Sequence, residues 1–358
     1  MIYKRVSPFV PSLLRSVARQ SEFVTNPVKI MKCDSKFEVF VTRADMPESG
    51  IEMIRRECNV KLWNRSSPVP RDEFLKLVPG VNAIYCCLTD KIDKELLDAA
   101  GPELKAVATM SVGYDHIDIQ ECNKRGIRVG YTPDVLTDAT AELTVSCLLL
   151  ATARRLPEAQ AAARDGGWES WSPMWMTGPG LADSTVGIVG FARIGQAVAR
   201  RSQGLQHQRI IYCSRTARHE AKEVGARKVE FDDLLAESDF VICCAVLVPE
   251  TRHMFNRVAF DKMKRTAIFI NTSRGGTVDQ EALTEALQHK IIRGAGLDVT
   301  TPEPLPLDHP LLSLNNCIVL PHIGSATIDA RKTMAELTAV NILEALKGFE
   351  MPSELKIT

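Results

Sequence analysis

The sequence lacks the features that would mark a membrane protein or a nucleic-acid-binding protein. Its 358 residues include 44 Lys and Arg and 44 Asp and Glu, so the net charge is zero. This balance provides no basic surface for nucleic acid or for an anionic membrane. The longest apolar stretch, residues 143–153, contains three hydroxyl side chains and is too short to span a bilayer. We therefore expect neither a nucleic acid nor a membrane as a partner.

The ten cysteines form none of the patterns that indicate a metal site or a disulfide framework. No C-x-x-C occurs, and no Cys/His group has zinc-finger spacing. Several cysteines stand in apolar, strand-like segments, which is typical of free buried thiols in a reducing compartment. We expect no metal and a cytoplasmic location.

The beginning of the chain differs in charge from the rest. Residues 1–32 contain six basic side chains and one acid, Glu22. This composition is typical of a mitochondrial transit peptide, although Pro8 and Pro11 limit a helix there to about two turns. An extension with no targeting role explains the same composition. We take residues 1–35 as an N-terminal extension, and no apolar h-region indicates a secretory signal.

Strand-like and helix-like segments alternate in two series, over residues 37–130 and 185–298. This alternation predicts parallel sheets with helices on their faces, and the chain has a two-domain length. We therefore predict an α/β protein with two doubly wound, Rossmann-like domains. Between the two series, Asp138 is placed to N-cap a long apolar helix that reaches residue 153, and residues 329–346 predict a final amphipathic helix.

An apolar, strand-like segment leads into the pattern Gly190-x-Ala192-x-x-Gly195. In the dinucleotide fingerprint G-x-G-x-x-G, the first glycine makes a tight turn, the second admits the pyrophosphate and the third lets helix and strand pack closely. The strand before and the helix after favour a dinucleotide site over an ordinary turn. The phosphates would lie at the helix N-terminus, around Arg193 and Ile194. Ala192 adds a methyl group at this approach and puts the cofactor affinity in question.

The next strand-like segment indicates which dinucleotide is used. About twenty residues beyond the turn, NAD-binding proteins carry an acid for the ribose 2′-OH. Here the sequence has Arg215 and then Arg218, and a guanidinium suits a 2′-phosphate. Ser214 and Thr216 offer further hydrogen bonds. We predict that NADPH is preferred and that NADH is a second cofactor, while Arg215 as a solvated surface charge is the alternative.

Polar side chains follow three later strand-like segments. Arg274 stands in Asn-Thr-Ser-Arg-Gly-Gly, Glu303 in Leu-Asp-Val-Thr-Thr-Pro-Glu-Pro and His322 in Leu-Pro-His-Ile-Gly-Ser. Ligands of open α/β sheets bind beyond the carboxyl ends of the strands, so these residues could converge. Arginine suits a carboxylate, histidine exchanges a proton near neutral pH, and a neighbouring carboxylate favours the imidazolium. Taken singly, each also fits an ordinary loop.

These motifs resemble the Arg–Glu–His signature of the D-isomer-specific 2-hydroxyacid dehydrogenases. Residues 110–116, 125–137 and 351–356 resemble more specifically the animal glyoxylate/hydroxypyruvate reductase branch of that family, and the resemblance covers residues 37–358. It implies NADPH-dependent reduction of glyoxylate to glycolate and of hydroxypyruvate to D-glycerate. Two alternatives stay open: a reductase for a bulkier 2-oxo acid, and a dinucleotide-sensing binding protein with little turnover.

The resemblance also implies how the chain is divided. A discontinuous, flavodoxin-like substrate domain would comprise residues 36–133 and 316–358, and the dinucleotide-binding Rossmann domain would comprise residues 134–315. The family forms homodimers, and in close relatives a tryptophan reaches the substrate pocket of the partner. Trp171 is the candidate here, and an ordinary core or interface tryptophan is the alternative.

Residue roles follow from the same resemblance. Arg274 would hold the substrate carboxylate and polarise the 2-oxo group, His322 would donate the proton as hydride arrives from the nicotinamide, and Glu303 would pair with His322. The backbone at Val112 and Gly113 would lie against the substrate carboxylate. The fingerprint and the resemblance together imply cofactor contacts from Gly190, Ala192, Arg193, Ile194, Gly195, Ser214, Arg215, Thr216, Arg218, Asp298 and Gly324.

Overall fold

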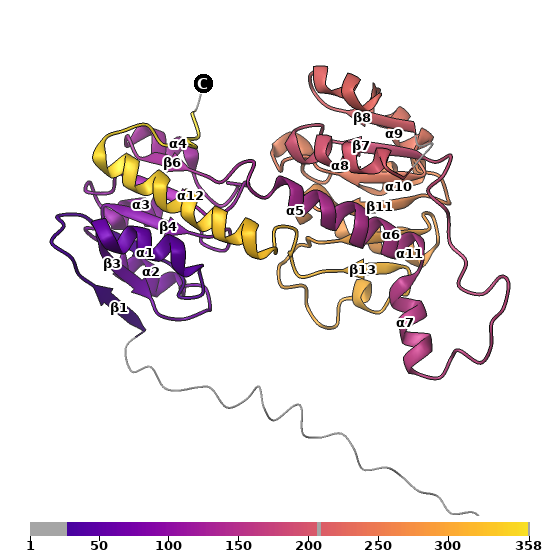
Figure 1. Ribbon diagram of the computed structural model, residues 1–358, viewed down its shortest axis with the longest axis horizontal. Coiled ribbons are helices and arrows are strands. Elements are labelled where there is room, and N and C mark those ends of the chain that lie inside the picture. Colours follow the sequence, from indigo (N-terminus) through magenta and orange to yellow (C-terminus); the bar gives the residue numbers. More distant parts are fainter. Residues whose placement is uncertain (1–26, 206–208, 357–358) are drawn as a thin grey trace, which may run out of the picture.

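The computed structural model describes residues 27–205 and 209–356, and it folds them into two α/β domains joined side by side (Figure 1). Each domain is built around one largely parallel sheet with helices on both faces. The predicted fold class is therefore confirmed. The targeting prediction depends chiefly on residues 1–26, which lie outside the described part of the chain.

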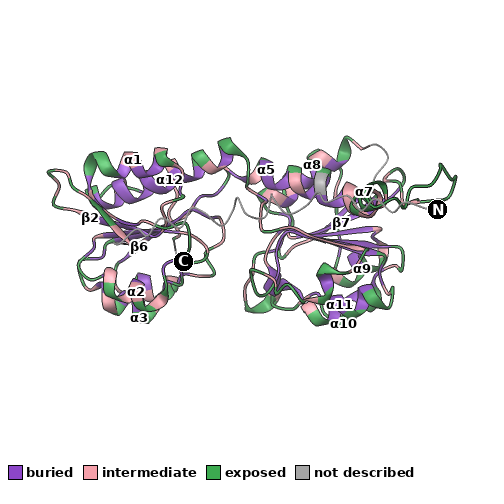
Figure 2. Cartoon of the chain, turned by 90° about the horizontal axis from the view of Figure 1, so that it is seen from below, coloured by how far each residue is buried: buried purple, intermediate pink, exposed green. Residues whose placement is uncertain are grey.

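The first sheet has six strands in the order β1-β3-β2-β4-β5-β6, and only the β1–β3 pair is antiparallel. The strands are β1 (Val28–Met31), β2 (Glu38–Val41), β3 (Asn59–Trp63), β4 (Ala83–Cys86), β5 (Ala106–Thr109) and β6 (Arg128–Gly130). One face is covered by α1 (Glu48–Glu57) and the C-terminal α12 (Ile328–Lys347), and the other by α2 (Arg71–Leu77) and α3 (Lys94–Ala100), as Figure 2 shows. The short α4 (Ile119–Lys124) precedes β6.

The second sheet has seven parallel strands in the order β13-β12-β11-β10-β7-β8-β9. They are β7 (Thr185–Val189), β8 (Arg209–Cys213), β9 (Arg227–Lys228), β10 (Phe240–Cys243), β11 (Ile268–Asn271), β12 (Gly294–Leu297) and β13 (Cys317–Val319). α5 (Thr137–Glu142) and α8 (Arg193–Gln203) cover one face. α9 (Phe231–Glu237), α10 (Arg257–Lys262) and α11 (Gln280–Gln288) cover the other.

The central strands of both sheets are buried on both faces. Every residue of β4, β10 and β11 is buried, as expected for parallel strands covered by helices on either side. Alternate side chains of each strand therefore enter different cores: Val241 and Phe269 pack with the α9–α11 layer, whereas Ile242 and Ile270 pack with the α5 and α8 layer. This rigid double core holds the carboxyl ends of the strands in place.

The predicted long helix after the first domain is present but not uniform. It consists of α5, a π-helical stretch (Leu143–Leu149) and α6 (Leu150–Ala153), and α7 (Leu156–Arg164) follows it. The prediction that Asp138 caps this helix is wrong, because α5 begins at Thr137 and Leu136 is its N-cap. Asp138 lies inside the first turn, where an acid suits the helix dipole, and its carboxylate pairs with Arg201 at 2.9 Å.

Two predicted boundaries are corrected by strand pairing. β1 lies within the predicted extension 1–35 but pairs with β3, so the extension ends earlier than expected. β13 lies after the predicted return at residue 316 but pairs with β12, so it belongs to the second sheet and the chain crosses back later. Both strands are edge strands of three or four residues, and such short strands carry little periodicity to reveal their partner.

Three observations on the described residues concern their cysteines, membrane-spanning helices and metal sites. Nine of the ten cysteines are described as free thiols, either buried or half-buried. Within residues 27–205 and 209–356, no helix is both long and apolar enough to cross a bilayer. In the same ranges no three His, Cys, Asp or Glu side chains are grouped to hold a metal ion.

Candidate functional site

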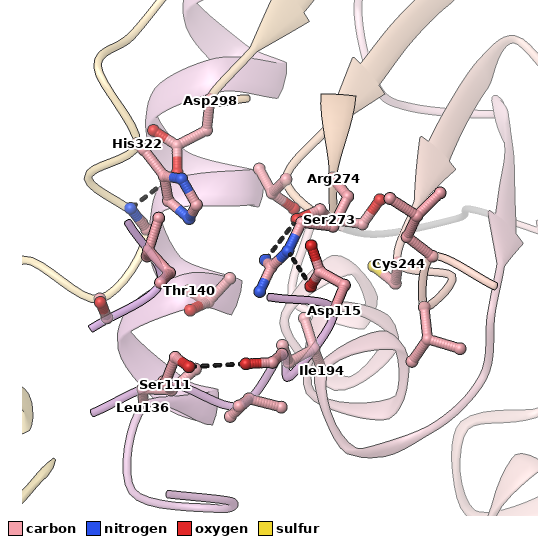
Figure 3. Close-up of a pocket in the computed structure, with 18 of the residues that line it drawn as sticks. Ser111, Asp115, Leu136, Thr140, Ile194, Cys244, Ser273, Arg274, Asp298 and His322 are labelled. Atoms are coloured by element: carbon pink, nitrogen blue, oxygen red, sulfur yellow. Dashed lines mark hydrogen bonds and ion pairs between the residues drawn. The ribbon is translucent and has the colours of Figure 1, made fainter. Parts of the chain in front are cut away.

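A cleft between the two domains brings several of the predicted site residues together. Its volume, including the open mouth, is about 1050 Å³. The first domain contributes the loop after β5, which includes Val112 and Gly113, and the start of α12. The second domain contributes Arg274, Asp298 and His322 among others. Figure 3 shows these side chains from different elements facing one space.

The predicted convergence of strand ends is observed. Arg274 follows β11, Glu303 follows β12 and His322 follows β13, and these three strands are neighbours in the second sheet. Because all strands of this sheet are parallel, their carboxyl ends lie at one edge. Segments separated by tens of residues in the sequence therefore meet at the cleft.

His322 and Glu303 form a direct pair. Nδ1 of His322 lies 2.8 Å from Oε2 of Glu303, and their side chains are 24% and 32% exposed. Burial alone would raise the pKa of Glu303, but the hydrogen bond and charge of His322, a bond from the Thr300 N–H and the charge of Arg274 together lower it below its usual value. The carboxylate is therefore ionised at neutral pH, and it holds the imidazole through their shared hydrogen bond.

Asp298 braces the turn that carries His322. Its two carboxylate oxygens accept the backbone N–H groups of Ile323 and Gly324, each at 2.7 Å. The N–H of His322 itself bonds to the Asp298 carbonyl at 2.9 Å. His322 has a φ of +55°, a left-handed conformation that is uncommon for a residue other than glycine. These three bonds hold that conformation. Burial raises the pKa of the Asp298 carboxyl, although the N–H groups of Ile323 and Gly324 and the charge of His322 act in the opposite direction.

Arg274 is fixed by contacts from both domains. Its Nε donates to Oδ1 of Asp115 at 2.9 Å, and its Nη1 donates to the Ser273 carbonyl at 2.9 Å. Gly113 lies directly against the guanidinium, because a Cβ at that position would be 1.7 Å from Nη2 of Arg274. Glycine at position 113 is therefore what allows the first domain to approach this side chain.

The turn after β7 fits a dinucleotide. Gly190 has a φ of +91°, and a Cβ there would collide with the backbone of Cys244 and Ala245. A Cβ at Gly195 would lie 2.2 Å from the Gly190 carbonyl oxygen, so this glycine permits the close packing of α8 on the turn. Ala192 is the N-cap of α8, and its exposed methyl cannot satisfy the first N–H groups of the helix. Those groups suit the phosphates of NAD(P).

The side chains of Arg193 and Ile194, the first two residues of α8, contact residues outside the helix's own sheet. Arg193 pairs with the segment that enters the second domain, and Ile194 packs against the core of the first domain. Nε of Arg193 lies 2.5 Å from Oδ1 of Asp134. Ile194 is half-buried, packs against cores of both domains and lines the cleft. The Nη groups of Arg193 have no part in this exposed ion pair, so both they and its backbone N–H remain candidates for the predicted cofactor contact.

The predicted 2′-phosphate residues lie together after β8. Arg215, Thr216 and Arg218 are exposed, and Ser214 is half-buried with its hydroxyl donating to the Thr216 carbonyl at 2.7 Å. Two guanidinium groups are therefore free of the core at the strand end where the ribose of a dinucleotide is expected.

Trp171 is a predicted substrate-binding residue that does not line the cleft of its own chain. It is 81% exposed, in the segment after α7 that extends away from the second domain (Figure 1). Val112, Gly113 and Gly324 do line the cleft, as expected. A side chain this exposed is not part of a core, so the core alternative for Trp171 is wrong. An interface position and a role in the partner's pocket stay open.

Sequence reasoning missed Asp115 and the hydroxyl groups of the cleft. Thr272 and Ser111 line the cleft: Thr272 shares a hydrogen bond of 2.9 Å with the buried Thr144 behind it, and Ser111 donates to the Gly113 carbonyl at 2.6 Å. Hydroxyl residues carry no distinctive spacing that would have revealed them. Asp115 could have been predicted from the sequence, because it stands two residues after Gly113 in a segment that already resembled the family.

Comparisons with known proteins agree with this geometry. A family model described as "D-isomer specific 2-hydroxyacid dehydrogenase, NAD binding domain" matches residues 146–324. The mouse protein named glyoxylate reductase/hydroxypyruvate reductase is 53% identical over 334 residues, which cover 92% of this chain and 99% of the mouse protein. The human protein of that name is 52% identical, with the same coverage of both chains.

Solved structures give the same result. A Thermus thermophilus protein superposes with a TM-score of 0.83 at 43% identity, covering 89% of this chain and all of the other. A Sinorhizobium meliloti protein, described as an NADPH-dependent glyoxylate/hydroxypyruvate reductase in complex with NADP and malonate, has a TM-score of 0.78 at 31% identity and covers 89% of this chain and 96% of its own. From this fold, this site and these similarities, the chain belongs to the D-isomer-specific 2-hydroxyacid dehydrogenase family.

Proposed function

We propose that this protein reduces glyoxylate to glycolate and hydroxypyruvate to D-glycerate, using NADPH. The observation that carries the proposal is the His322–Glu303 pair, 2.8 Å apart, whose His322 lines the same cleft as Arg274 and as Ile194 of the dinucleotide turn. An acid, its counter-charge and a carboxylate receptor are what the reduction of a 2-oxo acid requires. The names of the mouse and human relatives support the choice of substrates.

Each residue has a distinct part in this proposal. Arg274 binds the substrate carboxylate and stabilises the negative charge that develops on the 2-oxo oxygen. A reduced nicotinamide, when bound, supplies the hydride that reaches C2. His322 gives its proton to the 2-oxo oxygen, so that the carbonyl becomes a hydroxyl, and Glu303 keeps the ring oriented through their hydrogen bond. Asp298 holds the turn from which His322 projects.

We propose NADPH rather than NADH because of Arg215 and Arg218. Both are exposed at the end of β8, where a 2′-phosphate would lie, and no acid stands between them. The Sinorhizobium meliloti relative, described as NADPH-dependent and as holding NADP, is consistent with this preference. Asp298 and Gly324, which we propose to lie near the nicotinamide, line the cleft.

We further propose that the protein is a homodimer. α7 has no buried residue, and Trp168, Trp171 and Met174 are exposed in the segment that follows it. Large exposed apolar side chains gathered in one projecting segment are typical of an interface. In such a dimer Trp171 would reach the substrate cleft of the partner. Sedimentation analysis tests this proposal, and a Trp171→Ser variant that stays dimeric but accepts larger 2-oxo acids would support it.

The decisive experiment is a turnover assay. The loss of NADPH absorbance is followed with glyoxylate, hydroxypyruvate and a panel of bulkier 2-oxo acids, and each is repeated with NADH. We expect the highest kcat/KM for the two small substrates with NADPH. Preferred turnover of a bulkier acid would favour the first alternative, and tight NADPH binding without turnover would favour a sensing protein.

A further inference from the structure

Asp115 makes a contact that the proposed chemistry does not yet use. It lies in the loop after β5 of the first domain, whereas Arg274 follows β11 of the second, so their ion pair crosses the cleft. Nε of Arg274 and Oδ1 of Asp115 are 2.9 Å apart, with side chains 21% and 37% exposed. Burial would raise the pKa of Asp115, but the charge and hydrogen bond of Arg274 lower it, so the carboxylate is ionised.

The donors of Arg274 are divided between two tasks. A guanidinium has five N–H donors in a rigid planar fork. Nε is used by Asp115 and one N–H of Nη1 by the Ser273 carbonyl, contacts that Figure 3 draws. Two contacts on different nitrogens fix the plane of the group. The Nη2 side, against Gly113, is the part left to receive a carboxylate.

The loop that carries Asp115 is itself held on both sides. Ser111 bonds to the Gly113 carbonyl at 2.6 Å and to Thr109 at 2.9 Å, and Thr109 lies 3.0 Å from Nε2 of His116. Burial lowers the pKa of His116 to about 4, so this ring is neutral near pH 7. The cationic partner of Asp115 is therefore Arg274. The carboxylate therefore meets the guanidinium from a fixed position.

We propose that Asp115 is a positioning residue, which holds the Nε side of Arg274 so that the Nη groups receive the carboxylate and the 2-oxo oxygen of the substrate. This inference rests on the proposed reduction of 2-oxo acids and deepens it. The carboxylate of Asp115 also offsets the positive charge that attracts the anionic substrate. Asp115 therefore orients Arg274 but weakens the attraction of the anionic substrate. A substitution that removes only the charge of Asp115 separates these two effects.

The test compares Asp115→Ala with Asp115→Asn. Alanine removes the acceptor, so the guanidinium can turn away, and we expect kcat to fall by about ten- to a hundredfold, the range that misplacement of a catalytic group produces. Asparagine keeps an oxygen acceptor for Nε without the charge. We expect it to restore kcat to within about threefold of the wild type and to leave KM for the 2-oxo acid unchanged or lower, since a neutral hydrogen bond retains the orientation.

A matched control and a second background exclude a merely structural effect. Asp138→Ala removes another Asp–Arg pair that does not line the cleft, and we expect a change of less than about twofold, as for exposed pairs in general. In an Arg274→Lys background, which has no Nε donor, we expect Asp115→Ala to cost less than about twofold further. NADPH affinity and the thermal unfolding midpoint should stay as in the matched parent.

Inhibition by oxamate, a 2-oxo acid analogue that is not reduced, gives a readout without turnover. We expect weaker inhibition in Asp115→Ala and not in Asp115→Asn. The inference is overturned if Asp115→Ala keeps wild-type kcat and KM, if Asp115→Asn loses as much as Asp115→Ala, or if the loss persists in the Arg274→Lys background. Failure of the proposed function is a separate result: it would be a wild-type chain that reduces no 2-oxo acid.

Discussion

The two domains have the same architecture but contribute different things to the cleft. The second domain carries Arg274, Glu303 and His322 at the ends of three adjacent parallel strands, together with the glycine turn before α8. In the proposed reaction, no residue of the first domain's loop after β5 transfers a proton. It brings Gly113, which allows close approach, and Asp115, which meets the guanidinium. One parallel sheet can thus provide reactive groups while another of the same kind provides shape and orientation.

This difference has a structural origin. In the second sheet, β11, β12 and β13 each end in a turn that presents a polar side chain at the same edge. In the first sheet, β4 and β5 end in buried Cys86 and Thr109, and the polar groups that follow mainly bond to one another. Substitutions of the strand-end residues Arg274, Glu303 and His322 should therefore change how the 2-oxo acid is bound or reduced, and substitutions of Asp115 should change how Arg274 is oriented. The Asp115 variants test the first domain's part, and the following predictions test the second domain's part, including its cofactor turn.

The largest effect is expected for His322→Ala. Loss of the proton donor should lower kcat for glyoxylate by about 10²–10⁴-fold, the usual contribution of a general acid, with little change in NADPH binding. Steady-state kinetics over a range of pH measures it. In the wild type the rate should decline as pH rises, because the imidazolium loses its proton. A variant that stays active, with a wild type that shows no alkaline decline, would remove His322 from the chemistry.

Next in size is Arg274→Lys. An ammonium keeps the charge but loses the planar fork, and a charge-assisted hydrogen bond contributes about 1.5–3 kcal/mol. We expect kcat/KM for the 2-oxo acid to fall by roughly ten- to a hundredfold. Cofactor affinity, measured by fluorescence titration of NADPH, should be unchanged. Weakened NADPH binding with normal substrate kinetics would place Arg274 in the wrong subsite.

Arg215→Ala should act on the cofactor alone. Removing one guanidinium from the 2′-phosphate should raise KM for NADPH by about tenfold while KM for NADH stays the same, because NADH has no phosphate to lose. Thr216→Ala is a neighbouring control from the same exposed segment, and its effect should be smaller. Equal losses for the two cofactors would show that Arg215 does not read the phosphate.

Glu303→Gln tests the counter-charge of the imidazole. The pKa of Glu303 is lowered through His322, so the carboxylate is charged from moderately acidic pH upward and is lost only as pH falls through that lowered value. An amide cannot favour the imidazolium in this way. We expect the alkaline decline of the reduction rate to move to lower pH and the maximal rate to fall by less than in His322→Ala. An unshifted profile would show that Glu303 only orients the ring.

The smallest effect is expected for Ala192→Gly. Removing the methyl restores the fingerprint, and glycine is a better N-cap than alanine. KM for NADPH should fall by about twofold, since the methyl at the N-cap of α8 is exposed and its backbone is already extended. No change in a careful titration would mean that the turn accommodates the methyl, and a weaker affinity would contradict the predicted role of this position.

The sequence predicted the α/β class, the glycine turn and the three strand-end residues because each depends on local patterns. Apolar strand segments followed by Arg274, Glu303 or His322 are visible without a structure, and parallel strands must end at one edge. The predicted N-cap at Asp138 was wrong because Leu136 is the N-cap, and Asp138 lies two residues later in the first turn, where an acid is also favourable. β1 was not predicted, and the strand before His322 was predicted but assigned to the wrong domain, because a strand of three or four residues reveals its sheet only through its neighbour.

Residue chemistry by itself therefore determined which groups could act: a guanidinium, an imidazole, carboxylates and a turn that only small residues fill. Their meeting was decided by tertiary structure. Sheet order placed β11, β12 and β13 side by side, and the approach of two domains put Asp115, 159 residues away in sequence, on the Nε of Arg274. Such a contact leaves no periodic signal in a single sequence, because it depends on the packing of two separate cores.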